Sequence, residues 1–251
     1  MGPTGSPDSI PQVWYAGSDT FLGELWTMLH LPYTLMVLSF VVMGAALSPR
    51  ISWLLLAGTV LAYFLGLGIG AHFLDQVPGM GSRYVRHWSD RALWVGGFLS
   101  LGAAVAIGVA GALWYVGFPL LLLVAVQTVC AVGYPLARWF GGALHRDSVF
   151  AVSWGSLPFL TSYYAQSGTI DLGSLLVAIA FGGVAVLEIR LSRASRRLRA
   201  EARSFSSSES AAVAAPRDSF RTFDRALQLL STATIVVALA LFAGRVAFTV
   251  W

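Results

Sequence analysis

The chain has 251 residues, of which 57% are hydrophobic and only 11% are charged, and its formal net charge is +4. Soluble domains usually carry about 25% charged residues, so a chain this apolar lacks the polar surface needed to face water on all sides. The composition indicates a protein embedded in a lipid bilayer, and the small positive charge does not argue for nucleic-acid binding.

Missing residue types exclude several kinds of chemistry. All basic residues are arginine, and the chain contains no lysine and no asparagine. Without lysine no Schiff base can form, which excludes a retinal photoreceptor. Without asparagine there is no N-glycosylation acceptor. Cys130 is the single cysteine, so an intrachain disulfide and a cysteine metal cluster are also excluded.

Residues 1–20 are rich in Gly, Pro, Ser and Asp and predict a mobile tail without the pattern of a cleaved signal peptide. Residues 21–251 predict a single transmembrane helical domain. It contains apolar runs that are each long enough to cross a hydrocarbon core of about 30 Å. We place these runs at 26–47, 51–72, 92–113, 116–137, 148–166, 172–190 and 226–248. The expected fold is an all-α polytopic membrane protein with about seven transmembrane helices in one bundle.

The arginines are distributed unevenly between the predicted loops. All but Arg50 and Arg245 follow the second, fourth or sixth apolar run. Cytoplasmic loops carry an excess of arginine, so we expect a cytoplasmic N-terminus and an external C-terminus, in the cell (inner) membrane. The longest of these loops, residues 190–225, is rich in Arg and Ser. Its first part predicts a helix that continues past the membrane, with the arginines of 193–203 facing solvent or lipid headgroups.

Ionisable residues at the ends of apolar runs are the first functional candidates, because burying them in a bilayer is costly. His72 and Asp75 end the second run, and their spacing of three places both on one helical face. They could bind a metal or hold an anion through it, or they could simply pack and cap the following loop. Glu188 ends the sixth run beside Arg190, where it could line a polar cavity or pair with a nearby arginine.

Three further groups have a functional and an ordinary interpretation. Arg83 and Arg86, with His87, could bind a phosphate or could anchor the second loop at the membrane surface. His30 opens the first run and could face the bundle interior or the interface. Tyr164 ends the fifth run, where an interfacial aromatic belt also explains it.

Two segments resemble the UbiA superfamily of intramembrane prenyltransferases. The first run resembles the family's opening helix and reads LHLPYTLMVLSFVVMGAAL. The second segment resembles the fifth-to-sixth helix region of the branch that prenylates naphthoquinone precursors, where a Tyr-Tyr-x-Gln-Thr-Gly turn precedes an apolar helix. Here that segment reads WGSLPFLTSYYAQSGTIDLGSLLVAIAFGGVAVLEIR. The resemblance covers most of residues 26–190.

The resemblance implies two acidic motifs after the second and sixth helices, which hold Mg²⁺ on a prenyl diphosphate. Both motifs are degenerate, because they read AHFLDQVPG at 71–79 and LEIRLSR at 187–193. So few hard oxygen ligands would hold Mg²⁺ poorly, and arginines would partly replace the metal. The resemblance implies catalytic roles for Asp75 and Glu188, with Asp75 as a weak metal ligand. It implies substrate-binding roles for His72, Arg83, Arg86, Arg190, His30 and Tyr164.

The expected function is therefore that of a UbiA-like prenyltransferase, or a related isoprenoid-converting enzyme, acting on a prenyl diphosphate or a lipid-linked substrate. Its partner would be an isoprenoid or another membrane lipid. The alternative is a non-enzymatic isoprenoid- or lipid-binding membrane protein that has lost the metal sites. A transporter is disfavoured, because the sequence shows no matching pair of interrupted helices in two halves.

Overall fold

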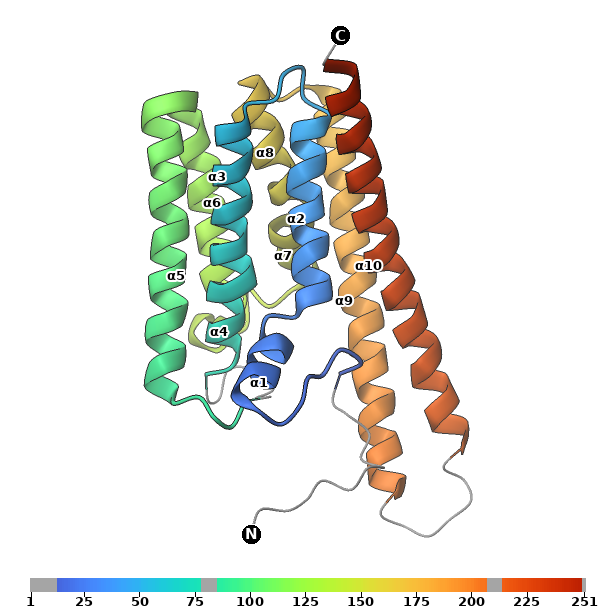
Figure 1. The fold of residues 1–251 in the computed structure, drawn as a ribbon. Helices are drawn as coiled ribbons and strands as arrows, with labels where there is room; N and C mark the ends of the chain where they lie inside the picture. The colour runs from blue at the N-terminus through green and yellow to red at the C-terminus, as the bar shows by residue number, and fades with distance from the viewer. Residues whose placement is uncertain (1–12, 78–84, 207–213, 250–251) are drawn as a thin grey trace.

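The computed structural model describes residues 13–77, 85–206 and 214–249, and over these residues every regular element is helical (Figure 1). In chain order the elements are α1 (Phe21–Met28), α2 (Leu31–Ala46), α3 (Trp53–Tyr63), the π-helix η1 (Phe64–Ala71), α4 (His72–Asp75), α5 (Asp90–Gly111), the π-helix η2 (Ala112–Val116), α6 (Pro119–Gly133), the 3₁₀-helix η3 (Ala137–Phe140), α7 (Asp147–Phe150), the π-helix η4 (Ala151–Ser156), α8 (Leu157–Ser167), α9 (Leu172–Ser206) and α10 (Ala214–Thr249).

Local sequence signals explain where several of these helices begin and end. Thr20 caps α1 by accepting a hydrogen bond from the Gly23 amide, and Ser89 caps α5 in the same way through the Ala92 amide. Such side-chain acceptors satisfy amides that have no partner inside the helix. At the other end of α8, Gly168 adopts a left-handed conformation with φ of 73°, which ends the helix before α9 begins.

The helices cover all the predicted apolar runs, but the prediction of seven membrane spans is not confirmed. Four helical segments are long and apolar enough to cross a bilayer, and the number rises to five if α1 and α2, bent by 44°, count as one span. Helix α6 has 15 residues. At about 1.5 Å per residue it falls short of a hydrocarbon core of about 30 Å. Helix α8 carries several Ser, Thr and Tyr side chains, which lower its apolarity.

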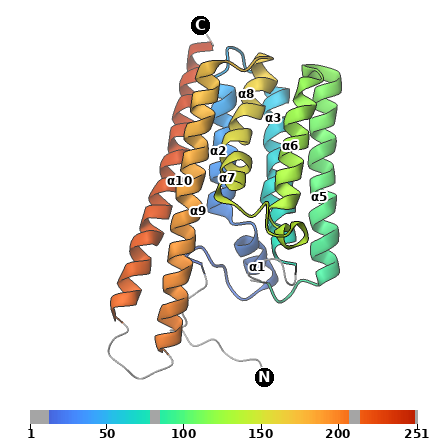
Figure 2. The same ribbon diagram turned by 180° about the vertical axis from the view of Figure 1, so that it is seen from behind.

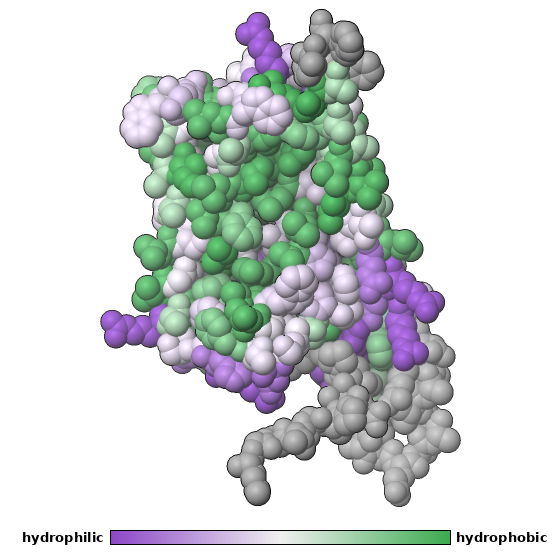
Figure 3. Space-filling model, in the orientation of Figure 1, coloured by the Kyte–Doolittle hydropathy of each residue, from purple (hydrophilic) through white to green (hydrophobic). Residues whose placement is uncertain are grey.

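The long helices run side by side, with α9 and α10 extending beyond the others at one end (Figures 1 and 2). Apolar residues cover the middle height of the visible face, and polar residues gather toward its two ends (Figure 3). Arg245 donates to the backbone carbonyl of Pro49, so Arg245 and the short loop that carries Arg50 lie at the same end of the bundle, opposite α4 (Figure 1). This arrangement fits an integral membrane protein, while the orientation of its termini stays a prediction.

The core is centred on α2, which packs against α8 on one side and α10 on another. Phe40 and Phe159 are fully buried where α2 meets α8. The two helices approach closely because a Cβ atom at Gly44 would lie only 2.5 Å from the Phe159 carbonyl oxygen. This contact fixes α2, and with it the residues that precede α2, against the rest of the bundle.

The described part of the predicted tail packs on the bundle. Val13 and Tyr15 are buried beside Tyr33 and Leu227, and the Trp14 indole donates to the Tyr33 hydroxyl at 3.1 Å. The sequence did not predict that these aromatic side chains belong to the core, because they lie in a polar segment. The segment from residue 13 onward therefore covers α2 and α10 near the start of α2.

Candidate functional site

A polar cavity of about 130 Å³ lies where η1, α4 and α9 meet the start of α2 and the segment around Tyr134. Its chemically distinctive lining residues are His30, Tyr33, His72, Asp75, Tyr134, His145, Glu188, Ser192, Arg193 and Arg196. Apolar side chains, among them Leu67 and Trp154, complete the wall. His145 is exposed, so the cavity reaches the surface at the polar end of the bundle. Such a concave, mainly apolar wall with a few converging polar groups is the usual form of a ligand site.

Two carboxylates face this cavity without a partner. Glu188 is only 3% exposed, and neither Glu188 nor the partly buried Asp75 forms a hydrogen bond or ion pair within the described part of the chain. Removing a carboxylate from water costs on the order of several kcal/mol. Here Arg196 acts electrostatically on both acids, and Arg193 acts on Glu188 as well. The two acids and the two arginines therefore share one cavity, where the acids can take up a proton and the arginines can bind an anion.

His30 and His72 form a stacked pair beside the carboxylates. Their ring centroids are 4.5 Å apart and their planes differ by 17°. His30 Nδ1 lies 2.7 Å from the Met28 carbonyl oxygen, and His72 Nδ1 lies 3.0 Å from that of Gly68. These contacts orient both rings by fixing the Nδ1 sides on the backbone.

The backbone around each histidine is unusual. His30 has φ of 47°, the one left-handed non-glycine residue in the part of the chain that the structure describes, and it stands at the bend between α1 and α2. Such a conformation costs about 1–2 kcal/mol. His72 directly follows the π-helix η1, and π-helical turns are frequent at functional sites. Both irregularities bring imidazole groups to the same cavity.

Arginines from α9 supply positive charge at the cavity. Arg193 donates to the Tyr134 hydroxyl at 3.1 Å and also to Asp147. Asp147 accepts a second hydrogen bond, from Arg190 Nε at 2.9 Å. The hydrogen bonds from Arg190 and Arg193 lower the pKa of Asp147 below its usual range. Arg196 lines the cavity one helical turn beyond Ser192. The site therefore offers two guanidinium groups, which match phosphate oxygens well.

The structure brings together some of the residues singled out from the sequence and separates others. His30, His72, Asp75 and Glu188 line the polar cavity. Arg190 is exposed and pairs with Asp147 instead, and Arg86 is exposed in the segment before α5. Tyr164 lies near the end of α8, whose Gln166 hydrogen-bonds with Ser52 at the opposite end of the bundle. Arg83 lies outside the described residues.

Other lining residues were missed from the sequence, although a signal was present for one of them, Arg196. Arg193 and Arg196 were predicted to face solvent or headgroups, but both line the cavity. Glu188, Ser192 and Arg196 follow one another at intervals of four along α9, which places them on one helical face. Tyr134 and His145, which stack at 4.5 Å, lie in an irregular segment that no periodic pattern could place.

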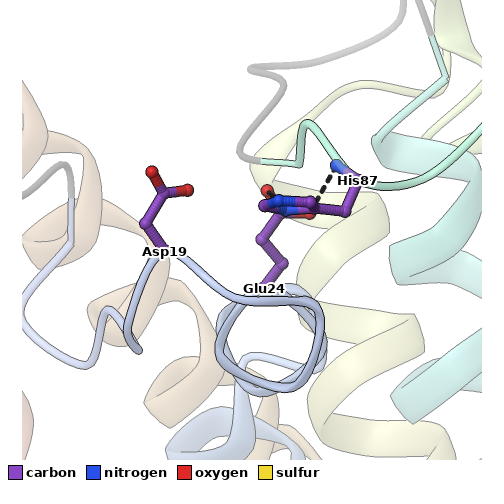
Figure 4. A group of neighbouring side chains, drawn as sticks. All are labelled: Asp19, Glu24 and His87. Carbon is purple, nitrogen blue, oxygen red and sulfur yellow. Dashed lines mark hydrogen bonds and ion pairs between the residues drawn. The ribbon is translucent and has the colours of Figure 1, made fainter. Parts of the chain in front are cut away.

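A second cluster of possible metal ligands consists of Asp19, Glu24 and His87 (Figure 4). It is the single group of three such side chains within 4.8 Å of one another in the described ranges. Glu24 is 5% exposed, and it accepts hydrogen bonds from the amides of Arg86 at 2.7 Å and His87 at 3.0 Å, and from His87 Nδ1 at 2.9 Å. The Glu24 carboxylate is thus occupied in holding this segment against α1, and the cluster carries no argument for Mg²⁺.

The chain was compared with protein-family models, with curated proteins and with solved structures, and none of the three comparisons gave a match.

Proposed function

We propose that this protein is an intramembrane enzyme that binds a prenyl diphosphate, or a related phosphate-bearing lipid, in the polar cavity and transfers or converts its isoprenoid group. The observation that carries the proposal is that one cavity gathers Arg193 and Arg196, which match phosphate oxygens, with Asp75 and Glu188, which can accept a proton. The arrangement agrees with the resemblance of residues 26–190 to UbiA prenyltransferases, which also work at the ends of the second and sixth helices.

The charged groups of the cavity suit alkyl transfer from a diphosphate. The bond between the first prenyl carbon and the diphosphate oxygen would break, and its electron pair would leave with the diphosphate. Arg193 and Arg196 would stabilise the charge that develops on this leaving group. The acceptor would form a bond to the same carbon and lose a proton, which Glu188 or Asp75 would take up. The acceptor is a quinone precursor, another lipid or a sugar phosphate.

Mg²⁺ is the cofactor that the resemblance implies, and the cavity fits it poorly. Mg²⁺ requires hard oxygen ligands in near-octahedral geometry. Within the described residues no three metal-ligating side chains of this cavity come within 4.8 Å of one another, and its other polar groups are imidazole, guanidinium and hydroxyl groups. We therefore propose that guanidinium groups supply most of the positive charge and that diphosphate binding depends only weakly on Mg²⁺.

A second candidate is a non-enzymatic protein that binds an isoprenoid or another lipid. The loss of most acids from both degenerate motifs favours it, because a binding protein needs no metal-assisted ionisation. Such a protein would keep the cavity and its arginines, and it would bind a prenyl diphosphate without consuming it.

The experiment that separates the two is turnover of radiolabelled geranylgeranyl diphosphate by purified protein, with a dihydroxynaphthoate or membrane lipids as acceptor. We expect release of diphosphate and a labelled lipid product both with Mg²⁺ and with a chelator. Asp75→Asn should impair turnover more than binding. Binding without turnover under every condition would favour the lipid-binding protein, and absence of both would refute the proposed substrate class.

A further inference from the structure

Helix α1 exposes its apolar side chains and buries its polar ones. Leu22 is 73% exposed, Trp26 50% and Phe21 48%. On the opposite side of the helix, Glu24 and Thr27 are buried. A helix at the surface of a soluble protein shows the reverse arrangement, with its apolar side chains toward the core. The exposed face of α1 therefore suits apolar surroundings.

The neighbours of α1 indicate the depth at which it lies. Figures 1 and 2 show α1 at the end of the bundle where α4 ends and α5 begins. The buried Glu24 carboxylate accepts hydrogen bonds from the amides of Arg86 and His87, and the side chains of these two residues are exposed. Exposed charged side chains lie among lipid headgroups or in water, so α1 lies at the boundary between headgroups and acyl chains.

Aromatic side chains mark the same boundary. The rings of Phe21 and Trp88 stack with their centroids 4.5 Å apart, and Trp26 is half exposed on the same face of α1 as Leu22. Tryptophan is enriched where a membrane meets water. A second protein fits this face less well, because each partner of a stable complex contributes about 800 Å² of surface, and three side chains offer at most roughly half of that.

The end of α1 connects this face to the polar cavity. Met28, the final residue of α1, is fully buried, and its carbonyl oxygen lies 2.7 Å from His30 Nδ1. The His30 ring lines the polar cavity and stacks on His72. The axes of α1 and α2 differ by 44°, and His30, with its left-handed φ, lies at the bend. A displacement of α1 would therefore also displace the His30 ring.

We propose that α1 is an interfacial helix, that it inserts Leu22 and Trp26 into the bilayer surface, and that this insertion holds His30 in the polar cavity. The partner is the boundary between headgroups and acyl chains, into which such helices insert about 5–10 Å deep. Arg86 and Arg91, which are exposed beside α1, would face anionic headgroups there. The inference concerns the geometry of the cavity and does not depend on the proposed function.

A depth measurement on single-cysteine variants tests the insertion. Cys130 is replaced by Ala, and a nitroxide is attached at Leu22→Cys, Trp26→Cys, Leu176→Cys or Glu201→Cys in nanodiscs of phosphatidylcholine and phosphatidylglycerol. Leu176, exposed on the apolar part of α9, is the reference for the hydrocarbon core, and the exposed Glu201 is the reference for water. Relaxation by oxygen and by a water-soluble nickel chelate should place the labels at Leu22 and Trp26 about 5–10 Å below the headgroups.

Three results would overturn the insertion. Nickel accessibility at Leu22 and Trp26 equal to that at Glu201 would place α1 in water. Relaxation equal to that at Leu176 would place α1 in the hydrocarbon core, as part of one membrane span with α2. Exclusion of both reagents would mean that a protein surface, such as that of a second copy, covers α1.

Hydrogen exchange in the same nanodiscs tests the link to the polar cavity. Leu22→Ser combined with Trp26→Ser removes the apolar side chains of α1. The matched control is Leu113→Ser combined with Trp114→Ser, because these residues are 53% and 75% exposed in η2, at the other end of α5. We expect the amides of residues 29–34 to exchange about tenfold faster in the α1 variant alone, because the bend opens more often. Unchanged exchange in the α1 variant, or equal changes in both variants, would overturn the link.

Discussion

Helix α9 carries two buried charged side chains, and only one of them forms an ion pair. Glu188 is 3% exposed and has no hydrogen-bond partner among the described residues. Three turns further on, Arg199 is equally buried, but it forms an ion pair with Asp224 of α10, which also accepts a hydrogen bond from Ser195 at 2.6 Å. The Arg199 guanidinium lies over the Phe220 ring at 4.5 Å.

The difference indicates what each site is for. The charges of Arg199 and Asp224 compensate each other, so this site needs no ligand and holds α9 against α10. The Glu188 carboxylate has no hydrogen bond or ion pair within the described residues, only the longer-range charge of Arg193 and Arg196, and it faces a cavity with room for another molecule. Removing a charge should therefore reduce stability at the first site and activity at the second.

The largest expected effect is on stability, at the paired site. Arg199→Ala leaves Asp224 buried without its partner, which should lower the free energy of unfolding by about 3–5 kcal/mol. Unfolding by sodium dodecyl sulfate, followed by circular dichroism, measures it. Arg197→Ala is the control, because Arg197 is exposed on the same helix. Equal stabilities of the two variants would mean that the ion pair does not hold α9 and α10 together.

At the unpaired site the expected effect is on turnover. Glu188→Gln keeps the shape of the side chain and removes a proton acceptor, so turnover of prenyl diphosphate should fall about 10²-fold. Binding should be unchanged or tighter, because a negative charge beside the diphosphate is lost, and stability should not fall. Glu201→Gln, at an exposed position of α9, should change none of these. A loss of stability with normal turnover would mean that Glu188 stabilises the fold and does not act in turnover.

A third buried acid, Glu24, should also contribute to stability, but less than the ion pair between Arg199 and Asp224 does. Glu24→Gln weakens hydrogen bonds to the amides of Arg86 and His87, which should cost about 1–3 kcal/mol. Hydrogen exchange of residues 85–89 should become faster in this variant, while Asp19→Asn leaves it unchanged. If a divalent cation instead stabilises the protein and Asp19→Asn abolishes that effect, the cluster is a metal site.

The smallest effect is expected at Asp147, which is partly exposed. Arg190 and Arg193 lower its pKa, so its contribution to stability is present above the unfolded pKa of about 4 and is lost as pH falls through the folded value. Asp147→Asn should cost only about 0.5–1 kcal/mol at neutral pH and should remove this part of the acid sensitivity. Melting curves at pH 7 and near pH 3 measure it. An unchanged loss of stability on acidification would assign the sensitivity to other groups.

The sequence was informative wherever apolar composition alone decides the structure. Each predicted apolar run is helical, because a chain in lipid must satisfy its backbone hydrogen bonds within the segment. The number of spans was harder to predict, since α6 and α8 are apolar enough to pack but not long or apolar enough to count as spans. The bend at His30 depends on a single left-handed residue, which no periodicity reveals.

For the candidate site, polar residues that end an apolar run were easier to find than residues within a polar stretch. His72, Asp75 and Glu188 stand out because polar groups are rare beside apolar runs. Arg193 and Arg196 are hidden among other arginines of α9. The spacing of four from Glu188 through Ser192 marks Arg196, but only the packing of α9 against neighbouring segments distinguishes Arg193 from the exposed Arg197. Asp147, which positions Arg193, could be recognised only from contacts between distant parts of the chain.

The central claim is that the polar cavity binds the phosphate head of a lipid through Arg193 and Arg196. Isothermal titration with geranylgeranyl diphosphate in the presence of a chelator tests it most directly. We compare the wild type with Arg193→Ala/Arg196→Ala, with Arg197→Ala/Arg203→Ala at exposed positions of the same helix, and with Asp147→Asn. The Asp147 variant controls for the lost ion pair.

The account predicts binding without metal that weakens about tenfold to a hundredfold for each cavity arginine removed, since hydrogen bonds to charged groups contribute about 1.5–3 kcal/mol. The exposed pair and Asp147→Asn should change the affinity less than about threefold. Absolute dependence on Mg²⁺, equal losses in both arginine pairs, or no binding to the wild type would contradict it.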